Sequence, residues 1–367
     1  MDPTPAPRDA GIAPPRPPAL TAAAVRALID RVPRVRLAHL PTPLDELPRL
    51  TAAMGGATCP PLFVKRDDCT GLALGGNKSR HLEFTLADAL RQGADCVIQS
   101  AAPQSNDARQ LSAAAARLGL KTYLLPRSTL KVELQGNLLL DHLMGAEIRF
   151  IDPQVDREAE KRRLAEELRA KGRRPYVMGA PAVPECTAIA YTLCAVELHE
   201  QCQALGVDPA WVYVCSGSGV PHMGHGGGTQ AGLMLGGKAL GRRWKVVGLP
   251  ATRIGGDNRP SIAEIGNGAA QRLGLDARLE PGEVINTDAY VGEGYGLITD
   301  ACREAIYLVA RTEGLLLDPV YTGKVMAGLI DHIRAGRVGR DEPVIFVHTG
   351  GLPALFAYRD ELVGAPA

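Results

Sequence analysis

The chain lacks several features that would point quickly to a class of protein. Its 41 basic and 40 acidic residues leave a net charge of +1, so charge gives no reason to expect nucleic acid or a membrane surface as a partner. No apolar run reaches the ~18 residues that a membrane-spanning helix needs. The 367 residues, 46% hydrophobic and 22% charged, are instead typical of a globular protein, and this length favours two domains.

Familiar catalytic and metal-binding signatures are also absent. None of the eight cysteines forms a C-x-x-C pair, so we expect neither a zinc site nor a redox dithiol. There is no H-E-x-x-H sequence, no paired-carboxylate pattern and no Ser-His-Asp order. Cys186, Cys194 and Cys202 recur near one helix face and are predicted to be buried apolar side chains. Scattered thiols of this kind favour a reducing cytoplasm.

What the sequence does have is an alternation of short apolar runs with helical stretches from about residue 60. This favours open α/β sheets with helices on both faces. Residues 1–20, rich in proline and alanine and without the apolar segment of a secretory signal, are expected to be a disordered tail. The predicted strands are residues 96–100, 121–126, 147–151, 211–216, 244–250 and 343–349, and the predicted helices include residues 104–118, 134–144 and 157–170.

One lysine stands in an unusual place. Lys78 follows Gly75-Gly76-Asn77 and opens a predicted helix, where the helix dipole disfavours a cation. A neutral amine, or a lysine condensed with an aldehyde, suits this position better. Gln104, Ser105 and Asn106 follow a strand and open the next helix, an arrangement suited to a carboxylate, although a plain helix cap explains Ser105 or Asn106 equally well.

A glycine-rich segment, CSGSGVPHMGHGGGTQAGL, begins at Cys215 between a strand and a helix. It is not a dinucleotide fingerprint, because His222 takes the place of the third glycine, and it is neither a nucleophile elbow nor a Walker loop. A phosphate monoester is the simplest remaining ligand for its backbone amides. His222 and His225 lack further ligands for a metal, so a solvated loop is the favoured interpretation for them.

Aromatic residues make up only 4% of the chain, yet two tyrosines lie among glycines: Tyr295 in GEGYG, and Tyr321 in LDPVYTGK. A last cluster, HTGG, follows the final strand and carries Thr349. A lysine, a phosphate cradle, a carboxylate cradle and tyrosine hydroxyls together suggest pyridoxal phosphate acting on an amino acid.

The motifs GGNKSRHLEF, QSN, GEGYG, LDPVYTGKVMAGL and VHTGGLPALFAY resemble the family of D-cysteine desulfhydrase and 1-aminocyclopropane-1-carboxylate (ACC) deaminase, over roughly residues 36–360. The resemblance implies pyridoxal 5'-phosphate as cofactor, a small amino acid as substrate, and the α/β fold of the tryptophan synthase β-subunit (fold type II), with two open, doubly wound sheets. It also implies a homodimer. The larger, cofactor-binding domain would comprise residues 21–81 and 189–367, and a smaller α/β domain would comprise residues 82–188.

The resemblance also implies roles for the matching residues. Lys78 would hold the cofactor covalently and move the α-proton, while Ser105, Tyr295 and Tyr321 would act in catalysis. Gln104 and Asn106 would join Ser105 and the two tyrosines in substrate binding. The cofactor would contact Lys78 and the residues Asn77, Asn106, Gly217, Ser218, Gly219, Gly228, Thr229, Thr322 and Thr349.

Two positions separate the branches of this family. ACC deaminases read Tyr-Glu-Gly-Lys and His-Leu-Gly-Gly where this chain has threonine at Thr322 and Thr349, as in the D-cysteine desulfhydrase pattern. A threonine can donate to a neutral pyridine nitrogen, which makes a weaker electron sink than a glutamate-bound ring but suffices to lose a good β-leaving group. The predicted reaction is therefore α,β-elimination, with D-cysteine giving pyruvate, sulfide and ammonia.

Departures from the family pattern leave alternatives open. His81 stands where the family usually has lysine, Asp107 where it has histidine or glutamine, and residues 220–227 are an insertion in the phosphate loop. The alternatives are ACC deaminase, an (R)-cysteate sulfo-lyase-like activity or another β-eliminating enzyme of specialised metabolism. A non-catalytic amino-acid-binding protein is a further alternative, against which the retained Lys78 counts.

Overall fold

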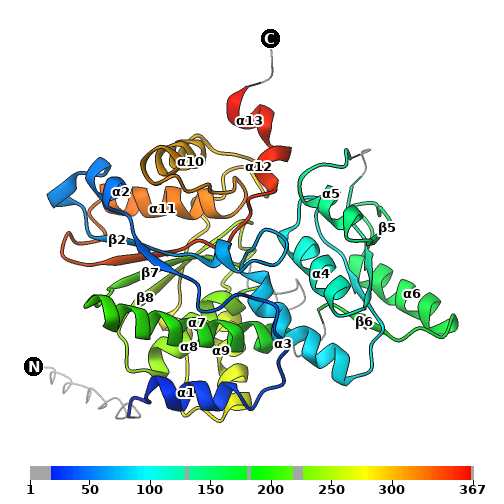
Figure 1. The fold of residues 1–367 in the computed structure, drawn as a ribbon. Helices are drawn as coiled ribbons and strands as arrows, with labels where there is room; N and C mark the ends of the chain where they lie inside the picture. Colours follow the sequence, from blue (N-terminus) through cyan, green and yellow to red (C-terminus); the bar gives the residue numbers. More distant parts are fainter. Residues whose placement is uncertain (1–17, 129–131, 180–182, 218–225, 365–367) are drawn as a thin grey trace, which may run out of the picture.

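The computed structural model describes residues 18–128, 132–179, 183–217 and 226–364 of the chain (Figure 1). The tail predicted for residues 1–20 lies almost wholly outside these ranges. Two parallel sheets, each covered by helices on both faces, form the described part of the protein. This confirms the α/β architecture that the alternating sequence pattern predicts.

Six strands of the described residues form the larger sheet, in the order β1-β2-β10-β7-β8-β9. They are β1 (Leu44–Glu46), β2 (Leu62–Lys65), β7 (Trp211–Ser216), β8 (Lys245–Pro250), β9 (Ile285–Asn286) and β10 (Val344–Val347). Only β1 is antiparallel to its neighbour. The last strand, β10, lies in the middle of the sheet, with Val344 opposite Leu62 on one side and Trp211 on the other.

Successive side chains of each strand enter different cores, because side chains alternate between the faces of a sheet. Phe63 and Ile345 join one core, and Val64 and Phe346 join the other. The first core is closed by α1 (Ala22–Ile29), α7 (Val183–Leu205), α8 (Gly228–Ala239) and α9 (Arg259–Leu273). The second is closed by α2 (Pro48–Ala53), α10 (Asp300–Glu313) and α11 (Thr322–Arg334). Burial on both faces explains the continuous apolar runs of these strands.

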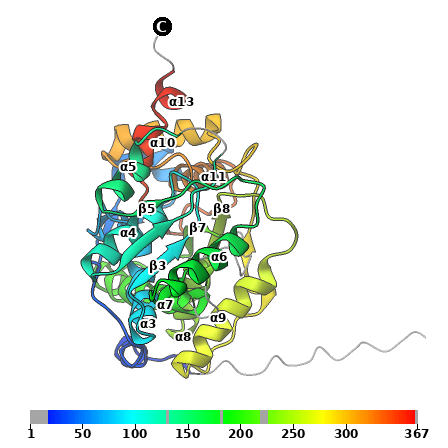
Figure 2. The ribbon, with the colours of Figure 1, turned by 90° about the vertical axis from the view of Figure 1, so that its right-hand side faces the viewer.

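Four parallel strands of the described residues form the smaller sheet, in the order β5-β4-β3-β6. They are β3 (Cys96–Gln99), β4 (Lys121–Leu124), β5 (Glu147–Ile148) and β6 (Pro175–Val177). Val97 packs against α3 (Lys78–Arg91) and α4 (Asn106–Arg117), whereas Cys96 and Ile98 pack against α6 (Arg157–Ala170) on the other face (Figure 2). The sheet is thus also doubly wound.

The remaining elements lie at the edges of the two sheets. α5 (Gly136–Leu143) contacts α4 and α12 (Ala354–Ala357), and α13 (Arg359–Val363) ends the described chain (Figure 1). Short 3-10 turns cover Gly56–Thr58, Asp67–Cys69 and Pro281–Glu283. Within the described residues, no helix is both long and apolar enough to cross a membrane.

The long helix α7 contains the three cysteines that the sequence spacing places near one helix face. Cys186, Cys194 and Cys202 are each at most 2% exposed, which confirms that they are buried apolar side chains. α7 packs closely on α8, where a Cβ atom on Gly232 would lie 2.2 Å from the carbonyl oxygen of Ala188. Glycine at this position is therefore what allows the two backbones to approach.

Each of the six predicted strands contains an observed strand. The largest difference is at residues 147–151, where only Glu147 and Ile148 form a strand, although Ile151 bridges Arg127. β2 lies in the strand-like stretch LFVKRDD. Sequence patterns did not predict β1, β6 or β9, which have only two or three residues and too little alternation to detect. The predicted helices 104–118 and 134–144 are shorter at both ends, and 157–170 matches α6.

The proposed division into domains, at residues 82–188, stays a prediction. The smaller sheet is formed entirely by residues between 96 and 177, and the larger sheet by strands on either side of that stretch. The two proposed boundaries fall inside helices, because α3 begins at Lys78 and α7 begins at Val183. Both helices would therefore link the two domains.

Candidate active site

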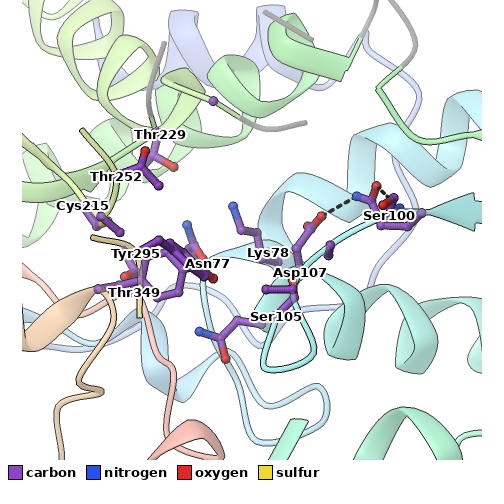
Figure 3. A pocket seen from close by; sticks show the side chains of 18 of the residues that line it. Asn77, Lys78, Ser100, Ser105, Asp107, Cys215, Thr229, Thr252, Tyr295 and Thr349 are labelled. Carbon is purple, nitrogen blue, oxygen red and sulfur yellow. Dashed lines mark hydrogen bonds between the residues drawn. The ribbon is translucent and has the colours of Figure 1, made fainter. Parts of the chain in front are cut away.

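A cavity of about 440 Å³ is lined by residues from the carboxyl ends of strands in both sheets (Figure 3). Ser100 follows β3, Cys215 ends β7 and Thr349 follows β10. Open α/β sheets place their ligand sites at these ends. Of the predicted site residues, the cavity wall contains Asn77, Lys78, Ser105, Asn106, Gly217, Thr229, Tyr295, Tyr321 and Thr349.

Lys78 lies on a loop that is held in place by close contact between backbones. A Cβ atom on Gly350 would lie 2.7 Å from the Cα of Gly76, and the backbone N–H of Asn77 donates to the carbonyl of Thr349 at 3.0 Å. Gly76 and Gly350 also have φ values of 128° and 92°, in the region that favours glycine. The two glycine motifs of the sequence thus pack directly against each other and fix the start of α3.

Two side chains of α4 complete the support of this loop. Arg109 donates to the carbonyl oxygens of Ala73 and Gly75, and Gln110 Oε1 accepts from the backbone N–H of Ser79 at 2.6 Å. The sequence analysis did not single out either residue. The only sequence signal for them is that they follow Ser105 and Asn106 by one helical turn, on a helix expected to border the site.

The amino group of Lys78 points into the cavity, with the carboxylate of Asp107 beside it (Figure 3). Enclosure away from water lowers the pKa of Lys78 below its ordinary value, and the negative charge of Asp107 partly opposes this shift. Burial disfavours the charged form of a lysine. A lysine at the N-terminus of α3 is therefore tolerated as an amine that ionises less readily than an exposed one.

A buried ion-pair cluster lies behind the site, two residues along α3. Arg80 pairs with Asp67 and with Glu197, each at 2.8 Å, and Lys65 pairs with Glu197 at 2.9 Å. In the sequence, Lys65 lies in the strand-like stretch LFVKRDD, which predicts an ion pair with its acidic neighbours. This prediction is wrong, because the partner of Lys65 is Glu197 of α7. Asp67 instead pairs with Arg80, and Asp68 with Arg66. Lys65 therefore has a structural role in this buried cluster, and it does not line the cavity.

Ser105 and Asn106, the predicted carboxylate-binding residues, both line the cavity at the start of α4. Ser105 caps α4, its hydroxyl accepting from the backbone N–H of Ala108 at 3.2 Å, so the helix-cap interpretation also holds. Asn106 Oδ1 accepts from Asn137 Nδ2 at 2.9 Å, which orients its amide. Gln104 is not brought into the cavity wall, because its side chain donates to the carbonyl of Gln135 and accepts from the backbone N–H of Asn137.

The glycine-rich segment and the start of α8 form another wall of the cavity. A Cβ atom on Gly217 would lie 2.4 Å from the Cα of Gly226, so the two ends of the segment are in contact. Ser216 Oγ is buried and has no hydrogen-bond partner among the described residues. Gly228 begins α8, and a Cβ atom on it would lie 1.6 Å from Thr187 Oγ1 of α7. Glycine at this position therefore lets the start of α8 pack closely against α7. Ser218, Gly219, His222 and His225 and most of the insertion 220–227 lie outside the described residues.

His81 is buried beside this wall. Its Nε2 lies 3.2 Å from the hydroxyl of Thr229, and its ring packs edge-on against Tyr191 at 5.3 Å between centroids. Thr229 is in the first turn of α8, where free backbone amides and the helix dipole favour an anion. The histidine that departs from the family pattern thus lies next to the residue best placed to bind a phosphate.

The two predicted tyrosines meet across the cavity. Their hydroxyl oxygens are 2.6 Å apart, and their rings are edge-on at 5.9 Å between centroids. Burial raises the pKa of both tyrosines above the ordinary value. Both hydroxyls therefore keep their protons near neutral pH, and one of the two donates to the other.

The two predicted threonines have different surroundings. Thr349 lines the cavity (Figure 3), and its backbone carbonyl accepts from the N–H of Asn77. The hydroxyl of Thr322 donates to Asp318 Oδ1 at 2.7 Å and accepts from the backbone N–H of Asp318 at 2.7 Å. Thr322 is not part of the cavity wall. Both hydrogen bonds of its hydroxyl are made to Asp318, one as donor and one as acceptor.

Several residues of the cavity wall were not predicted. Thr252 follows β8, and Arg127 follows β4, positions that the rule about strand ends would have selected. Arg157, Glu158 and Lys161 belong to the first turns of α6. No local motif marks these three residues, since the sequence around them reads as an ordinary charged helix.

Comparison with known proteins agrees with this geometry. The profile of the family described as "Pyridoxal-phosphate dependent enzyme" matches residues 35–350. The chain is 40% identical over 335 residues to the D-cysteine desulfhydrases of Salmonella schwarzengrund (strain CVM19633) and Salmonella newport (strain SL254), covering 90% of this chain and 97% of each relative.

The chain belongs to the pyridoxal-phosphate dependent enzyme family. A solved structure described as an ACC deaminase homologue has a TM-score of 0.80 and 37% identity to it, covering 93% of this chain and 98% of the other. A pyridoxal 5'-phosphate-dependent aspartate racemase shares the fold alone, with a TM-score of 0.61 and 17% identity. The resemblance and the type II fold predicted from the sequence are therefore confirmed.

The residues in the cavity fit pyridoxal phosphate, the cofactor of this family. Lys78 presents an amine with a lowered pKa to the centre of the cavity. Gly217, Gly226, Thr229 and the unpartnered hydroxyl of Ser216 supply amides and donors for a phosphate at the start of α8. Thr349 supplies a hydroxyl on the larger-sheet side. The thiol of Cys215 adds no charge, because burial raises its pKa to about 12.

Proposed function

We propose that the protein is a lyase that performs α,β-elimination on a small β-substituted amino acid, with D-cysteine as the first candidate. D-cysteine and water would give pyruvate, hydrogen sulfide and ammonia. The observation that carries this proposal is the position of Lys78 in the cavity, between a phosphate-binding wall and the Ser105–Asn106 segment. The named relatives at 40% identity support D-cysteine as the substrate.

Pyridoxal phosphate would supply the electron sink that stabilises negative charge at the substrate Cα. Lys78 would hold it covalently, the amides around Gly217 and Thr229 would bind its phosphate, and Asn77 would contact it beside Lys78. Thr349 would donate to its ring nitrogen. The neighbouring Thr322 would act indirectly, by holding Asp318 and the start of α11.

The remaining side chains would act on the substrate. Ser105 and Asn106 would bind the α-carboxylate at the N-terminus of α4, where the helix dipole favours an anion. Lys78 would take the α-proton, a task suited to an amine whose pKa is lowered by enclosure. The hydrogen-bonded pair Tyr295 and Tyr321 would donate to the departing thiolate. We do not assign Gln104 a direct role.

The first experiment is a visible spectrum of the purified protein, followed by a substrate screen. We expect the absorbance band of lysine-bound cofactor, lost on borohydride treatment, and keto acid release from β-substituted amino acids. The screen would include D- and L-cysteine, cysteate, β-chloroalanine and ACC. A colourless protein that cannot be reconstituted would instead support the non-catalytic amino-acid-binding alternative.

ACC deamination is the second candidate, and the structural neighbour described as an ACC deaminase homologue supports it. Threonine at both Thr322 and Thr349 favours elimination instead, because neither residue provides a carboxylate for the ring nitrogen. Faster turnover of ACC than of any β-substituted amino acid would reverse this order.

We further propose a cytoplasmic homodimer. All eight cysteines are free thiols in the structure, as in proteins of a reducing compartment. Light scattering coupled to gel filtration would test the dimer, with a mass near twice the 38.9 kDa of one chain as the expected result.

A further inference from the structure

Three basic side chains on the smaller-sheet side of the cavity have no part in the function proposed above. Arg127 follows β4, and Arg157 and Lys161 lie in the first turns of α6. Apart from Lys78, they are the cationic side chains that line the cavity in the described part of the chain. They outnumber the two carboxylates of the same wall, Asp107 and Glu158.

These cations come from elements of the smaller sheet, whereas Gly217 and Thr229 come from elements of the larger sheet. Figure 3 shows Thr229 and Thr252 on one side of Lys78, and Ser100 and Asp107 on the other. Arg127 belongs with the second group, because its backbone N–H donates to the carbonyl of Ala101 at 3.2 Å. A phosphate bound at the start of α8 would therefore leave Arg127 on the opposite wall.

Arg127 has unused hydrogen-bonding capacity. One terminal nitrogen donates to the carbonyl of Pro153, but Nε is buried without a hydrogen-bond partner among the described residues. A guanidinium has five N–H donors, and a buried donor without a partner is costly. Arg127 is thus held at the cavity wall with donors to spare.

Arg157 and Lys161 share one carboxylate between them. Lys161 Nζ lies 2.8 Å from Glu158 Oε2 and donates to the carbonyl of Met178 at 2.6 Å, so its position is fixed. Arg157 Nε lies 3.7 Å from Glu158 Oε1, too far for a good hydrogen bond. Both residues lie in the first two turns of α6, whose N-terminal amides are already capped by the side chain of Asp156, so their own charges and not the helix end would attract a further anion.

We propose that Arg127, Arg157 and Lys161 form a subsite for an anionic group at the end of the substrate's side chain. The inference rests on the proposed elimination and extends its substrates beyond D-cysteine to small amino acids whose β-substituent is an oxyanion: a sulfonate, a sulfate ester or a phosphate ester. Guanidinium groups match the paired oxygens of such anions. Water supplies the oxygen of the keto acid.

The bond changes follow from this assignment. The α-proton passes to Lys78, and the bond from Cβ to sulfur or oxygen breaks with its electron pair leaving on the anion. Hydrolysis then yields pyruvate and ammonia. Cysteate would release sulfite, serine O-sulfate would release sulfate, and O-phosphoserine would release phosphate.

The test compares charged and neutral substrates on the holoenzyme, using both enantiomers of each. We expect cysteate, serine O-sulfate or O-phosphoserine to have a KM at least tenfold lower than that of β-chloroalanine, and the preferred one identifies the oxyanion. Arg127→Gln should reduce this preference at least tenfold, and Arg127→Lys should restore part of it. Arg163→Gln, on the exposed side of α6, is the matched control and should leave the preference intact.

Calorimetry with aspartate and asparagine tests the subsite without turnover. This pair differs mainly in the charge at the end of the side chain, and neither contains a good β-leaving group. Wild type should bind aspartate at least tenfold more tightly, and Arg127→Gln should remove the difference. Equal binding of the two by wild type would overturn the subsite, whether or not any substrate is turned over.

Two further outcomes distinguish failure of the anion subsite from failure of the proposed elimination, and from a role of Arg127 in binding the cofactor. Turnover of β-chloroalanine with rejection of every oxyanion substrate would refute the subsite while leaving the proposed elimination standing. An Arg127→Gln variant whose dissociation constant for pyridoxal phosphate rises tenfold, with no change in the charged-to-neutral preference, would instead assign Arg127 to the cofactor phosphate.

Discussion

Replacing each of the two motif threonines by valine should separate a structural hydroxyl from one that faces the cavity. The hydroxyl of Thr322 both donates to and accepts from Asp318, at 2.7 Å in each case, and Thr322 is fully buried. A hydrogen bond to a charged group contributes about 1.5–3 kcal/mol, and a buried amide left without a partner costs about 1–3 kcal/mol. Thr322→Val should therefore lower the free energy of unfolding by about 3–5 kcal/mol.

Thr349→Val should behave in the opposite way. The carbonyl of Thr349, which valine retains, accepts the hydrogen bond from Asn77 N, while its side chain faces the cavity. We expect its free energy of unfolding to change by no more than about 0.5 kcal/mol. Its turnover should fall roughly tenfold, since losing one hydrogen bond worth about 1.4 kcal/mol in the transition state gives that factor.

Thermal melts and keto acid release measure the two effects side by side. For a chain of this length about 1 kcal/mol corresponds to roughly 2 °C, so Thr322→Val should melt about 6–10 °C lower than wild type. Thr312→Val is a control, because its hydroxyl bonds only to the carbonyl of Leu308 within α10. A Thr322→Val protein that melts like wild type but loses turnover would refute this separation.

Three further predictions follow from the site and its supports. Lys78→Ala should abolish turnover and the visible cofactor band while the fold persists. Lys65→Ala should keep the band but lose about 3–5 kcal/mol of stability, because it removes one of the two cations that pair with the buried Glu197. Loss of the band in Lys65→Ala but not in Lys78→Ala would show that Lys65, and not Lys78, holds the cofactor. Burial raises the pKa of Asp141 to about 7, above its unfolded value near 4, so ionisation costs stability progressively from pH 4 to 7. Asp141→Asn should then raise the free energy of unfolding by roughly 2–4 kcal/mol at pH 8, seen as a higher melting temperature, and should leave it unchanged at pH 4. Equal shifts at the two pH values would contradict the raised pKa of Asp141. Gly228→Ala places a Cβ atom 1.6 Å from Thr187 Oγ1 at the start of α8, so titration with pyridoxal phosphate should show weaker binding, and wild-type affinity would argue against a rigid cradle there.

Much of the fold could be predicted because its strands are buried on both faces. The run from Trp211 to Cys215 is apolar, and the helix that should follow each strand carries one apolar side. Three strands were not predicted, and each is too short for its periodicity to be detected: Leu44–Glu46, Pro175–Val177 and Ile285–Asn286. Their existence depends on pairing with a neighbour already in place.

Only those residues of the candidate site that belong to short sequence motifs were predicted. Lys78 and Thr349 sit in glycine motifs, and the reason for those glycines, backbone contact between Gly76 and Gly350, became visible only in three dimensions. The partner of Lys65 is 132 residues away in sequence, so neighbouring aspartates misled the prediction. Lys161 belongs to an ordinary-looking charged helix, and only the packing of α6 beside β3 brings it to the cavity. Arg127 follows β4, where the rule about strand ends would have selected it.

The central position of β10 has a consequence for how the protein is made. The larger sheet stays open between β2 and β7 until residues 344–347 leave the ribosome, although β2 has been synthesised long before. At 5–20 residues per second the interval between Lys65 and Val344 lasts roughly 15–55 s, during which two apolar strand edges lack their partner. Because the same late segment carries Thr349 and Gly350 against the Lys78 loop, closing the sheet and assembling the cofactor site are one event. A nascent chain that ends before residues 344–350 therefore exposes two apolar strand edges to aggregation and lacks a complete cofactor site.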